Sequence, residues 1–419
     1  MTINRTSLTP LSVAALVVAG GLALAAGQYG PGASDAEIKI GNTMPYSGPA
    51  SPYGTIGKSE AAYFAMINEQ GGIHGRKINF ISRDDSYSPP KTVELVRKLV
   101  EQDGVLALFQ TFGTAPNSAI REYLNDNKVP QLFVRTGASK WNDPKHYPWT
   151  MGWQPSYQIE GRIYARYILK NIPAAKIAVL YQNDDFGKDY LIGLRDGLGD
   201  KADGMIVASQ SYETTDATIH SQIVSLQTSG ANVLLTVALP KFAAQTIRKI
   251  YEIGWKPTHI LSSVSNSVGL VMRPAGPEKS VGIISATYGK DPTDPQWQDT
   301  LEYNEWLAWM KKYNTSGNVA DADTVYGYSA AQTMVAVLKA CGDNLTRENL
   351  MKQAASTGPP AADAATRHHH LDQRQRLHGD QADAIAEIRR NHLAAIWRLN
   401  LGVRQLSAYC YEVILMIGC

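Results

Sequence analysis

The segment from Met44 to Ile78, MPYSGPASPYGTIGKSEAAYFAMINEQGGIHGRKI, contains the residues whose types and spacing best suit a ligand. Its turn-rich loop includes Ser47-Gly48-Pro49 and ends at Tyr53-Gly54, directly before a predicted helix. The free N–H groups at a helix N-terminus suit an anionic or polar group of a ligand. Gly71-Gly72 then stops the helix. The segment therefore predicts a binding loop followed by a helix.

Other chemistries fit the sequence less well. Gly57-Lys58-Ser59 is similar to the end of a P-loop, but Pro52 stands where the leading glycine belongs, so the nucleotide interpretation fails on spacing. His368-His369-His370 cannot all face one ion, because adjacent residues of a helix or strand point in different directions. A G-x-S-x-G elbow is absent, which disfavours an exported α/β hydrolase without excluding a spatial triad. We expect no catalysis, no metal site and no cofactor.

The elements that must position these residues alternate in type for more than 300 residues. β-branched runs predict strands over 37–42, 77–82, 105–110, 131–134, 176–181, 233–237, 258–262 and 281–286. Helical periodicity predicts helices over 55–70, 91–103, 117–127, 160–171, 186–198, 219–229, 242–253, 299–313 and 323–340. This order is typical of an α/β fold with parallel sheets and helices on both faces, whose ligands bind at the strand-to-helix edge.

A long stretch after Val134, RTGASKWNDPKHYPWTMGWQPSY, breaks the alternation. It is longer than an ordinary connection between a strand and a helix, so we expect it to carry the chain from one lobe to another. We therefore predict two α/β lobes with a cleft between them. Residues 36–153 and 287–356 form the first lobe, and residues 154–286 form the second.

Composition and the N-terminus indicate an exported globular protein. Apolar residues make up 44% of the 419 residues and the net charge is +2, so the totals show no nucleic-acid footprint. Three cysteines, two of them in the last ten residues, provide no disulfide framework. Arg5, the apolar run 11–26 and Ala23-Leu24-Ala25 predict a signal peptide over residues 1–25, cleaved before Ala26. The run is short for a membrane anchor, so we expect a soluble periplasmic protein.

Several long motifs in order give the chain a family resemblance. They are IKIGNTMPYSGPASPYG, INEQGGIHGRKI, DDSYSPPKTVELVRKLVEQDGV, KIAVLYQNDDFGKD and GANVLLTVALPKFAAQTIRKIYEIGW. From about Ala36 to Ala355 the chain resembles the periplasmic substrate-binding proteins of branched-chain-amino-acid-type ABC transporters. The resemblance implies a type I two-lobed fold with a ligand in the interlobe cleft, and an ABC permease in the inner membrane as partner.

The resemblance also implies site residues. In the family's amino-acid binders, loops after the first, third and fourth strands of lobe one hold the ligand carboxylate and part of its side chain. Lobe two contributes an aromatic residue and an acid for the ammonium. The matching positions here are Tyr53; Phe112, Gly113 and Thr114; Thr136, Gly137 and Ser139; Phe186; and Val264.

Val264 is the departure that matters, because Ser262 to Asn266 offers no carboxylate for a ligand ammonium. A buried ammonium without a counter-charge would cost several kcal/mol. Phe112 replaces the family's serine and adds apolar surface for a ring. We therefore expect a carboxylic acid without an ammonium group, aromatic or otherwise apolar. Arg135 is the best local cation for its carboxylate, the alternative being a structural ion pair at a strand end.

The sequence thus predicts a monomeric periplasmic receptor that passes a small acid to an ABC permease and binds no nucleic acid. The alternatives are amino-acid binding for the same kind of uptake, a ligand sensor with this fold, and the exported hydrolase.

Residues 357–419 look foreign to the rest of the chain. Residues 361–419 hold seven arginines, five of the nine histidines and no lysine. Our hypothesis is a reading-frame shift near Asp363, because dropping one base permits LPG, QMQL and RFDG, which resemble the family's C-terminal strands. Resequencing the gene's 3′ end tests it, and we expect a frame-restored chain to be more stable.

Overall fold

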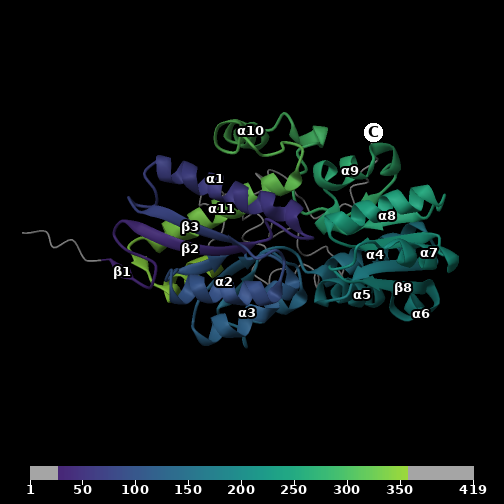
Figure 1. Cartoon of the computed structure of the whole chain (residues 1–419), viewed down its shortest axis with the longest axis horizontal. Helices are drawn as coiled ribbons and strands as arrows, with labels where there is room; N and C mark the ends of the chain where they lie inside the picture. Colours follow the sequence, from purple (N-terminus) through teal and green to yellow (C-terminus); the bar gives the residue numbers. More distant parts are fainter. Residues whose placement is uncertain (1–26, 357–419) are drawn as a thin grey trace, which may run out of the picture.

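Two parallel five-stranded sheets form the centres of two lobes in the computed structural model, which describes residues 27–356 (Figure 1). The strand order is β3-β2-β4-β5-β6 in lobe one and β11-β10-β9-β7-β8 in lobe two. Every pairing between these strands is parallel. The two-lobed α/β fold expected from the sequence is confirmed.

The strands of lobe one are β2 (Glu37–Met44), β3 (Lys77–Asp84), β4 (Ala107–Phe109), β5 (Gln131–Val134) and β6 (Thr150–Gly152). Its helices are α1 (Gly54–Glu69), α2 (Pro89–Glu101), α3 (Thr114–Asp126), α10 (Leu301–Tyr313), α11 (Ala322–Cys341) and α12 (Arg347–Ser356). A small separate ribbon pairs β1 (Gln28–Tyr29) with β12 (Asn344–Leu345).

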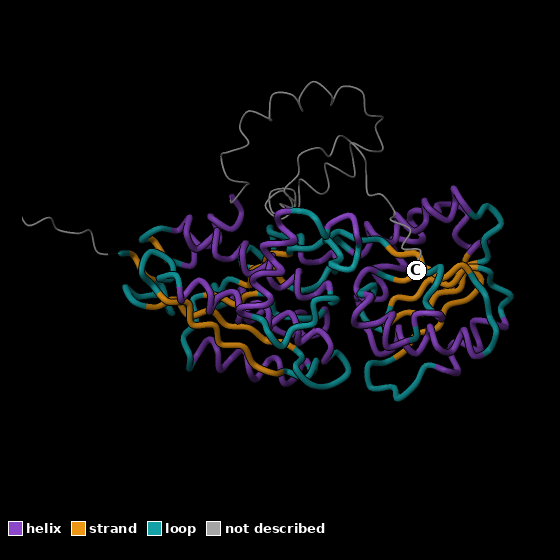
Figure 2. The backbone as a smooth tube through the Cα atoms, turned by 90° about the horizontal axis from the view of Figure 1, so that it is seen from above, coloured by secondary structure: helices purple, strands orange, loops and turns teal. Residues whose placement is uncertain are grey.

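The strands of lobe two are β7 (Ile177–Gln182), β8 (Ile206–Tyr212), β9 (Val233–Val237), β10 (Thr258–Leu261) and β11 (Ile284–Ser285). Its helices are α4 (Tyr157–Asn171), α5 (Asp185–Leu198), α6 (Ala202–Met205), α7 (His220–Thr228), α8 (Pro240–Glu252) and α9 (Arg273–Ala275). Figure 2 shows the two sheets in opposite halves of the described structure.

Alternating side chains explain why helices cover both faces of each sheet. On β7, Ile177 and Val179 pack in one core with α4 and α5, whereas Ala178 and Leu180 pack in another with α7 and α8. Successive residues of a strand point to opposite faces, and a sheet buried on both faces needs apolar residues at both sets of positions. The apolar runs of the sequence therefore predict this layering.

The chain passes between the lobes twice within the described residues. It leaves lobe one after Gly152 and enters α4 at Tyr157, and it returns between Ser285 and Leu301. The sheet orders place a switch point between β2 and β4 in lobe one and between β7 and β9 in lobe two. Ligands of open α/β sheets bind outside the carboxyl ends of strands at such switch points.

The predicted signal peptide and the tail from residue 357 lie outside the described residues. Among the residues that are described, no helix combines the length and apolar character that a membrane span requires. Cys341 is a buried free thiol.

Candidate functional site

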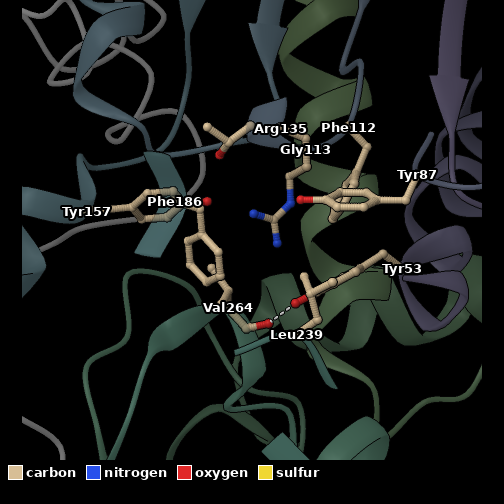
Figure 3. A pocket seen from close by; sticks show the side chains of 10 residues that line it. Tyr53, Tyr87, Phe112, Gly113, Arg135, Tyr157, Phe186, Leu239 and Val264 are labelled. Atoms are coloured by element: carbon tan, nitrogen blue, oxygen red, sulfur yellow. Dashed lines mark hydrogen bonds between the residues drawn. The ribbon is translucent and has the colours of Figure 1, made fainter. Parts of the chain in front are cut away.

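A pocket lies between the lobes where the two switch points face each other (Figure 3). Its cavity volume is about 20 Å³, and the space between its lining atoms reaches about 300 Å³ when the adjoining open solvent is counted. Lobe one contributes Tyr53, Tyr87, Phe112, Gly113, Thr114 and Arg135, and lobe two contributes Tyr157, Phe186, Leu239 and Val264. Nine of these residues lie in loops or helix starts that follow the carboxyl ends of seven strands. The tenth, Tyr157, begins α4 after the crossover.

Aromatic rings from both lobes form the walls of the pocket. In lobe one the ring centroid of Phe112 lies 4.7 Å from that of Tyr53 and 5.9 Å from that of Tyr87. In lobe two Tyr157 and Phe186 meet edge-on at 5.1 Å. Such walls favour a ligand with an apolar or aromatic body.

Arg135 follows β5, and its guanidinium points into the pocket between these walls (Figure 3). Its Nη1 donates to Gln154 Oε1 at 2.5 Å and its Nη2 donates to Asp323 Oδ1 at 3.3 Å. The guanidinium also lies 4.0 Å from the ring centroid of Tyr326. A guanidinium has five N–H donors, so these two bonds leave donors for a ligand carboxylate.

Among the described residues that line the pocket, Arg135 carries the only formal charge. Val264 occupies the position matched to the family's acid, and its carbonyl oxygen accepts a hydrogen bond from the Tyr53 hydroxyl of the other lobe. The pocket surface therefore favours an anion and offers an ammonium group no carboxylate.

On the lobe-two side, Glu160 and Asp184 lie behind the pocket surface, and both are already engaged. Glu160 accepts from the Ser263 backbone N at 2.8 Å, the Ser263 hydroxyl at 2.6 Å and the Tyr164 hydroxyl at 2.6 Å. Asp184 caps α5 by accepting from two backbone N–H groups of that helix. Burial raises the pKa of both carboxyls. Neither acid belongs to the residues lining the pocket.

The structure brings seven of the ten predicted site residues together around the pocket: Tyr53, Phe112, Gly113, Thr114, Arg135, Phe186 and Val264. The other three do not line it, and two of them are bonded to residues that do. The Thr136 hydroxyl bonds that of Thr114 at 2.6 Å, and the Gly137 carbonyl accepts from Tyr157 N at 2.7 Å. Ser139 bonds Asp189 through its backbone N at 2.6 Å and its hydroxyl at 3.1 Å.

The predicted site residues did not include Tyr87, Tyr157 or Leu239, which also line the pocket. Tyr87 follows β3, and positive φ angles of 53° at Ser86 and 62° at Tyr87 direct its ring. A Cβ on Gly113 would lie 2.3 Å from that ring, so the glycine makes room for it. The hydrophobic periodicity of the sequence does not reveal such turns, although this loop, DDSYSPP, begins one of the motifs that carry the family resemblance.

Direct contacts join the lobes around the pocket. Besides the Tyr53–Val264 and Ser139–Asp189 bonds, Lys140 Nζ meets Asp185 Oδ2 at 2.6 Å. Gln182 Nε2 donates to the Tyr87 hydroxyl at 3.3 Å. The structure therefore represents a conformation in which the lobes are closed on each other.

Comparisons with known proteins agree with this architecture. The chain is 27% identical over 349 residues to Leu/Ile/Val-binding protein homolog 1 of Brucella suis biovar 1 (strain 1330), covering 81% of this chain and 88% of the relative. The fatty acid ABC transporter substrate-binding protein from Thermomonospora curvata superimposes with a TM-score of 0.69 at 24% identity, covering 80% and 85%.

An R. palustris solute-binding protein in complex with 4-hydroxybenzoate superimposes with a TM-score of 0.65 at 16% identity, covering 76% of this chain and 84% of that one. The family described as periplasmic binding protein matches residues 37–390, which span most of the sequence. The chain belongs to the periplasmic binding protein family.

Proposed function

We propose that this protein is a periplasmic receptor for an ABC importer and that its ligand is a small aromatic or apolar carboxylic acid without an ammonium group. The observation that carries the proposal is the charge of the pocket. One guanidinium reaches it between aromatic walls, and no carboxylate lines it among the residues described. A carboxylate would bind the free donors of Arg135, and its apolar body would lie between the rings.

Relatives support more than one ligand class. The R. palustris protein binds 4-hydroxybenzoate and the T. curvata protein is named for fatty acids, whereas the Brucella relative is named for leucine, isoleucine and valine. The pocket favours the acids, because a buried ammonium would be left without a partner. Amino-acid binding is the second candidate.

A thermal-shift panel on the full chain tests this choice. It compares leucine with benzoate, 4-hydroxycinnamate and hexanoate at one pH. A ligand at 100 times its Kd adds about 2.7 kcal/mol of stability, which is readily measured as a rise in Tm. We expect an acid to raise the Tm and leucine to leave it unchanged. A rise with leucine alone would overturn the proposal.

Arg135→Gln gives a sharper test at the level of one side chain. Losing a charge-assisted pair costs about 3 kcal/mol, so we expect the affinity for a bound acid to fall about 100-fold in calorimetry. Arg97→Gln is the matched control, because this arginine is half-exposed on α2 in an ion pair with Glu101. Equal affinities of Arg135→Gln and the wild type would assign Arg135 a purely structural role.

A further inference from the structure

A buried pair of acids lies directly behind the pocket cation. Asp321 caps α11 and Asp323 lies in its first turn, with 1% and 9% of their surfaces exposed. Asp323 Oδ1 accepts from Arg135 Nη2 at 3.3 Å. Asp321 Oδ1 accepts from the Asp323 backbone N at 3.0 Å and from the Ser267 hydroxyl of lobe two at 3.2 Å. We call Asp321 and Asp323 the acid pair.

The groups that face the acid pair and Arg135 are mostly carboxyls and phenols. Among the described residues at this place, Arg135 is the one cation. These facing groups come from every element packed around the acid pair and Arg135 and are Tyr53, Thr55, Glu60, Gln154, Tyr157, Ser267, Tyr288, Asp291 and Tyr326. Glu60 is fully buried, and neither of its carboxylate oxygens has a hydrogen-bond partner. Asp323 and Glu60 thus interact with the guanidinium, and Asp321 and Asp291 interact with Asp323.

Burial raises the pKa of all four carboxyls. It raises the pKa of Glu60 well above its usual range, against the opposing effect of Arg135. It also raises the pKa of Asp291. Burial, with Asp323 as the second cause, raises the pKa of Asp321 to about 7. Burial raises the pKa of Asp323 too, although Arg135 opposes it.

In the free protein Arg135 already has Asp323 as its counter-ion. A ligand carboxylate arriving at the guanidinium would bring a second anion to the same cation in a closed, apolar site. Two carboxylates that share such a site cannot both remain ionised without a large cost, and a proton relieves it. Asp323 is the carboxyl bonded to Arg135, and Asp321 accepts from the backbone of Asp323, so the acid pair is the group placed to accept this proton.

We propose that binding of a carboxylate ligand at Arg135 is coupled to uptake of one proton by the acid pair Asp321–Asp323. The inference rests on the proposed function, because it requires an acid ligand. Its sign follows from linkage. A complex that holds one more proton than the free protein binds more weakly as pH rises, by up to about tenfold per pH unit. The effect is largest where the free pair is ionised, above about pH 7.

Isothermal titration calorimetry of the full chain with benzoate and with hexanoate tests the coupling. Titrations at pH 7.5 in phosphate and in Tris separate the proton heat, because the two buffers differ strongly in ionisation enthalpy. We expect uptake of up to about one proton per ligand and weaker binding at pH 8 than at pH 6.5. Both probes keep their own charge over this range.

Asp323→Asn should abolish the proton uptake and leave the ligand as the counter-ion of Arg135, so that affinity no longer falls with pH. Asp196→Asn, in an exposed ion pair of α5, is the control and should behave as wild type. If Asp323→Asn does not fold, Asp321→Asn serves instead, and uptake should then move to lower pH because the repulsion from Asp321 is gone.

Each outcome separates the two ideas. Acid binding without proton uptake, or uptake that persists unchanged in the aspartate variants, overturns the coupling and leaves the proposed function standing. Failure of both acids to bind overturns the proposed function, and the coupling falls with it. Uptake in the wild type that is lost in Asp323→Asn and retained in Asp196→Asn supports both.

Discussion

Val264 lines the lobe-two side of the pocket, and its carbonyl oxygen is bonded to Tyr53 of lobe one. The resemblance implies an acid at approximately this position in the family's amino-acid binders, so we expect Val264 to decide whether an ammonium group is tolerated. The resemblance predicts Val264 as a ligand-binding residue, and Val264 is among the residues that line the pocket. Whether it contacts a ligand is a prediction that substitution can test.

We expect Val264→Glu to exchange the ligand class. A carboxylate here would repel an acid ligand and lower the affinity for benzoate at least about tenfold, while giving leucine or phenylalanine a counter-charge. Val264→Gln has nearly the same shape without the charge and is the matched control. Calorimetry with benzoate and phenylalanine measures both effects. Identical results for the two variants would mean that size, not charge, governs the position.

His259 on β10 provides a pH-dependent term that is separate from the pocket. Its Nε2 lies 2.9 Å from the Thr236 hydroxyl, and burial lowers its pKa to about 4. The unfolded chain has a histidine pKa near 6.5, so between about pH 6.5 and pH 4 it binds more protons than the folded chain. Stability should therefore fall by about 3 kcal/mol as pH drops through this window.

Urea unfolding from pH 4 to pH 7 measures this loss. His259→Gln should flatten that limb of the stability profile, since glutamine does not titrate. His220→Gln, at an exposed position opening α7, should leave it unchanged. If the free energy of unfolding of His259→Gln falls below pH 6.5 as it does in the wild type, other groups cause the loss of stability.

At the scale of elements, every strand that the sequence predicts is present, with ends shifted by a few residues. The strand predicted over 281–286 is only the two-residue β11 in the structure, and the strand predicted over 105–110 is only β4, Ala107–Phe109. Helices α2 and α8 begin at prolines, Pro89 and Pro240, because proline is well suited to the first turn. The structure adds β1, β6, β8 and β12 and the helices α6, α9 and α12.

These additions share a physical cause. β8 is an edge strand whose serine and glutamine residues are not enclosed between two layers, so it lacks the apolar run of a central strand. β6 is short, pairs irregularly with β5 and lies in the crossover stretch rich in tryptophan and proline. Tertiary pairing, rather than local preference, defines both strands.

Helix α5 joins the lobes through its first turns. Asp189 accepts from the Ser139 backbone N and hydroxyl and from Gln158 Nε2 at 2.9 Å. Asp189→Ala removes the two bonds from Ser139 to lobe two, each worth about 1 kcal/mol, and leaves the other bonds between the lobes. At about 1.4 kcal/mol per tenfold, we expect the affinity for a bound acid to fall by up to about 30-fold and the radius of gyration in small-angle scattering to increase.

Asp203→Ala is the matched control for that experiment, because the exposed carboxylate of Asp203 pairs with Arg195 inside lobe two. It should change neither the affinity nor the radius. A variant at Asp189 that scatters and binds like wild type would show that the lobes close without this contact.

At the scale of the whole molecule, closure depends on the fit at the crossover. The Gly137 carbonyl accepts from Tyr157 N, the first residue of α4. A Cβ on Gly137 would lie 2.5 Å from the Pro155 carbonyl oxygen and 2.7 Å from the Tyr157 ring, so the backbone there would have to move.

Gly137→Ala should therefore act as a wedge between the lobes. Overpacking of this kind costs about 1–3 kcal/mol, so we expect a lower Tm and a larger radius of gyration with saturating benzoate. Gly152→Ala, whose Cβ would make its nearest contact at 3.4 Å, is the control in the same crossover. Equal scattering curves for the two variants would contradict the wedge.

When the lobes separate, the charged part of the pocket stays with lobe one, and part of its apolar wall moves with lobe two. Arg135 and Asp323 stay together in lobe one, whereas Phe186, Leu239 and Val264 leave with lobe two. An anion held at the guanidinium would thus remain on lobe one after opening, exposed on one flank to water. On the proposed function, a permease that accepts this anion would compete with a single cation of the receptor once lobe two has moved aside.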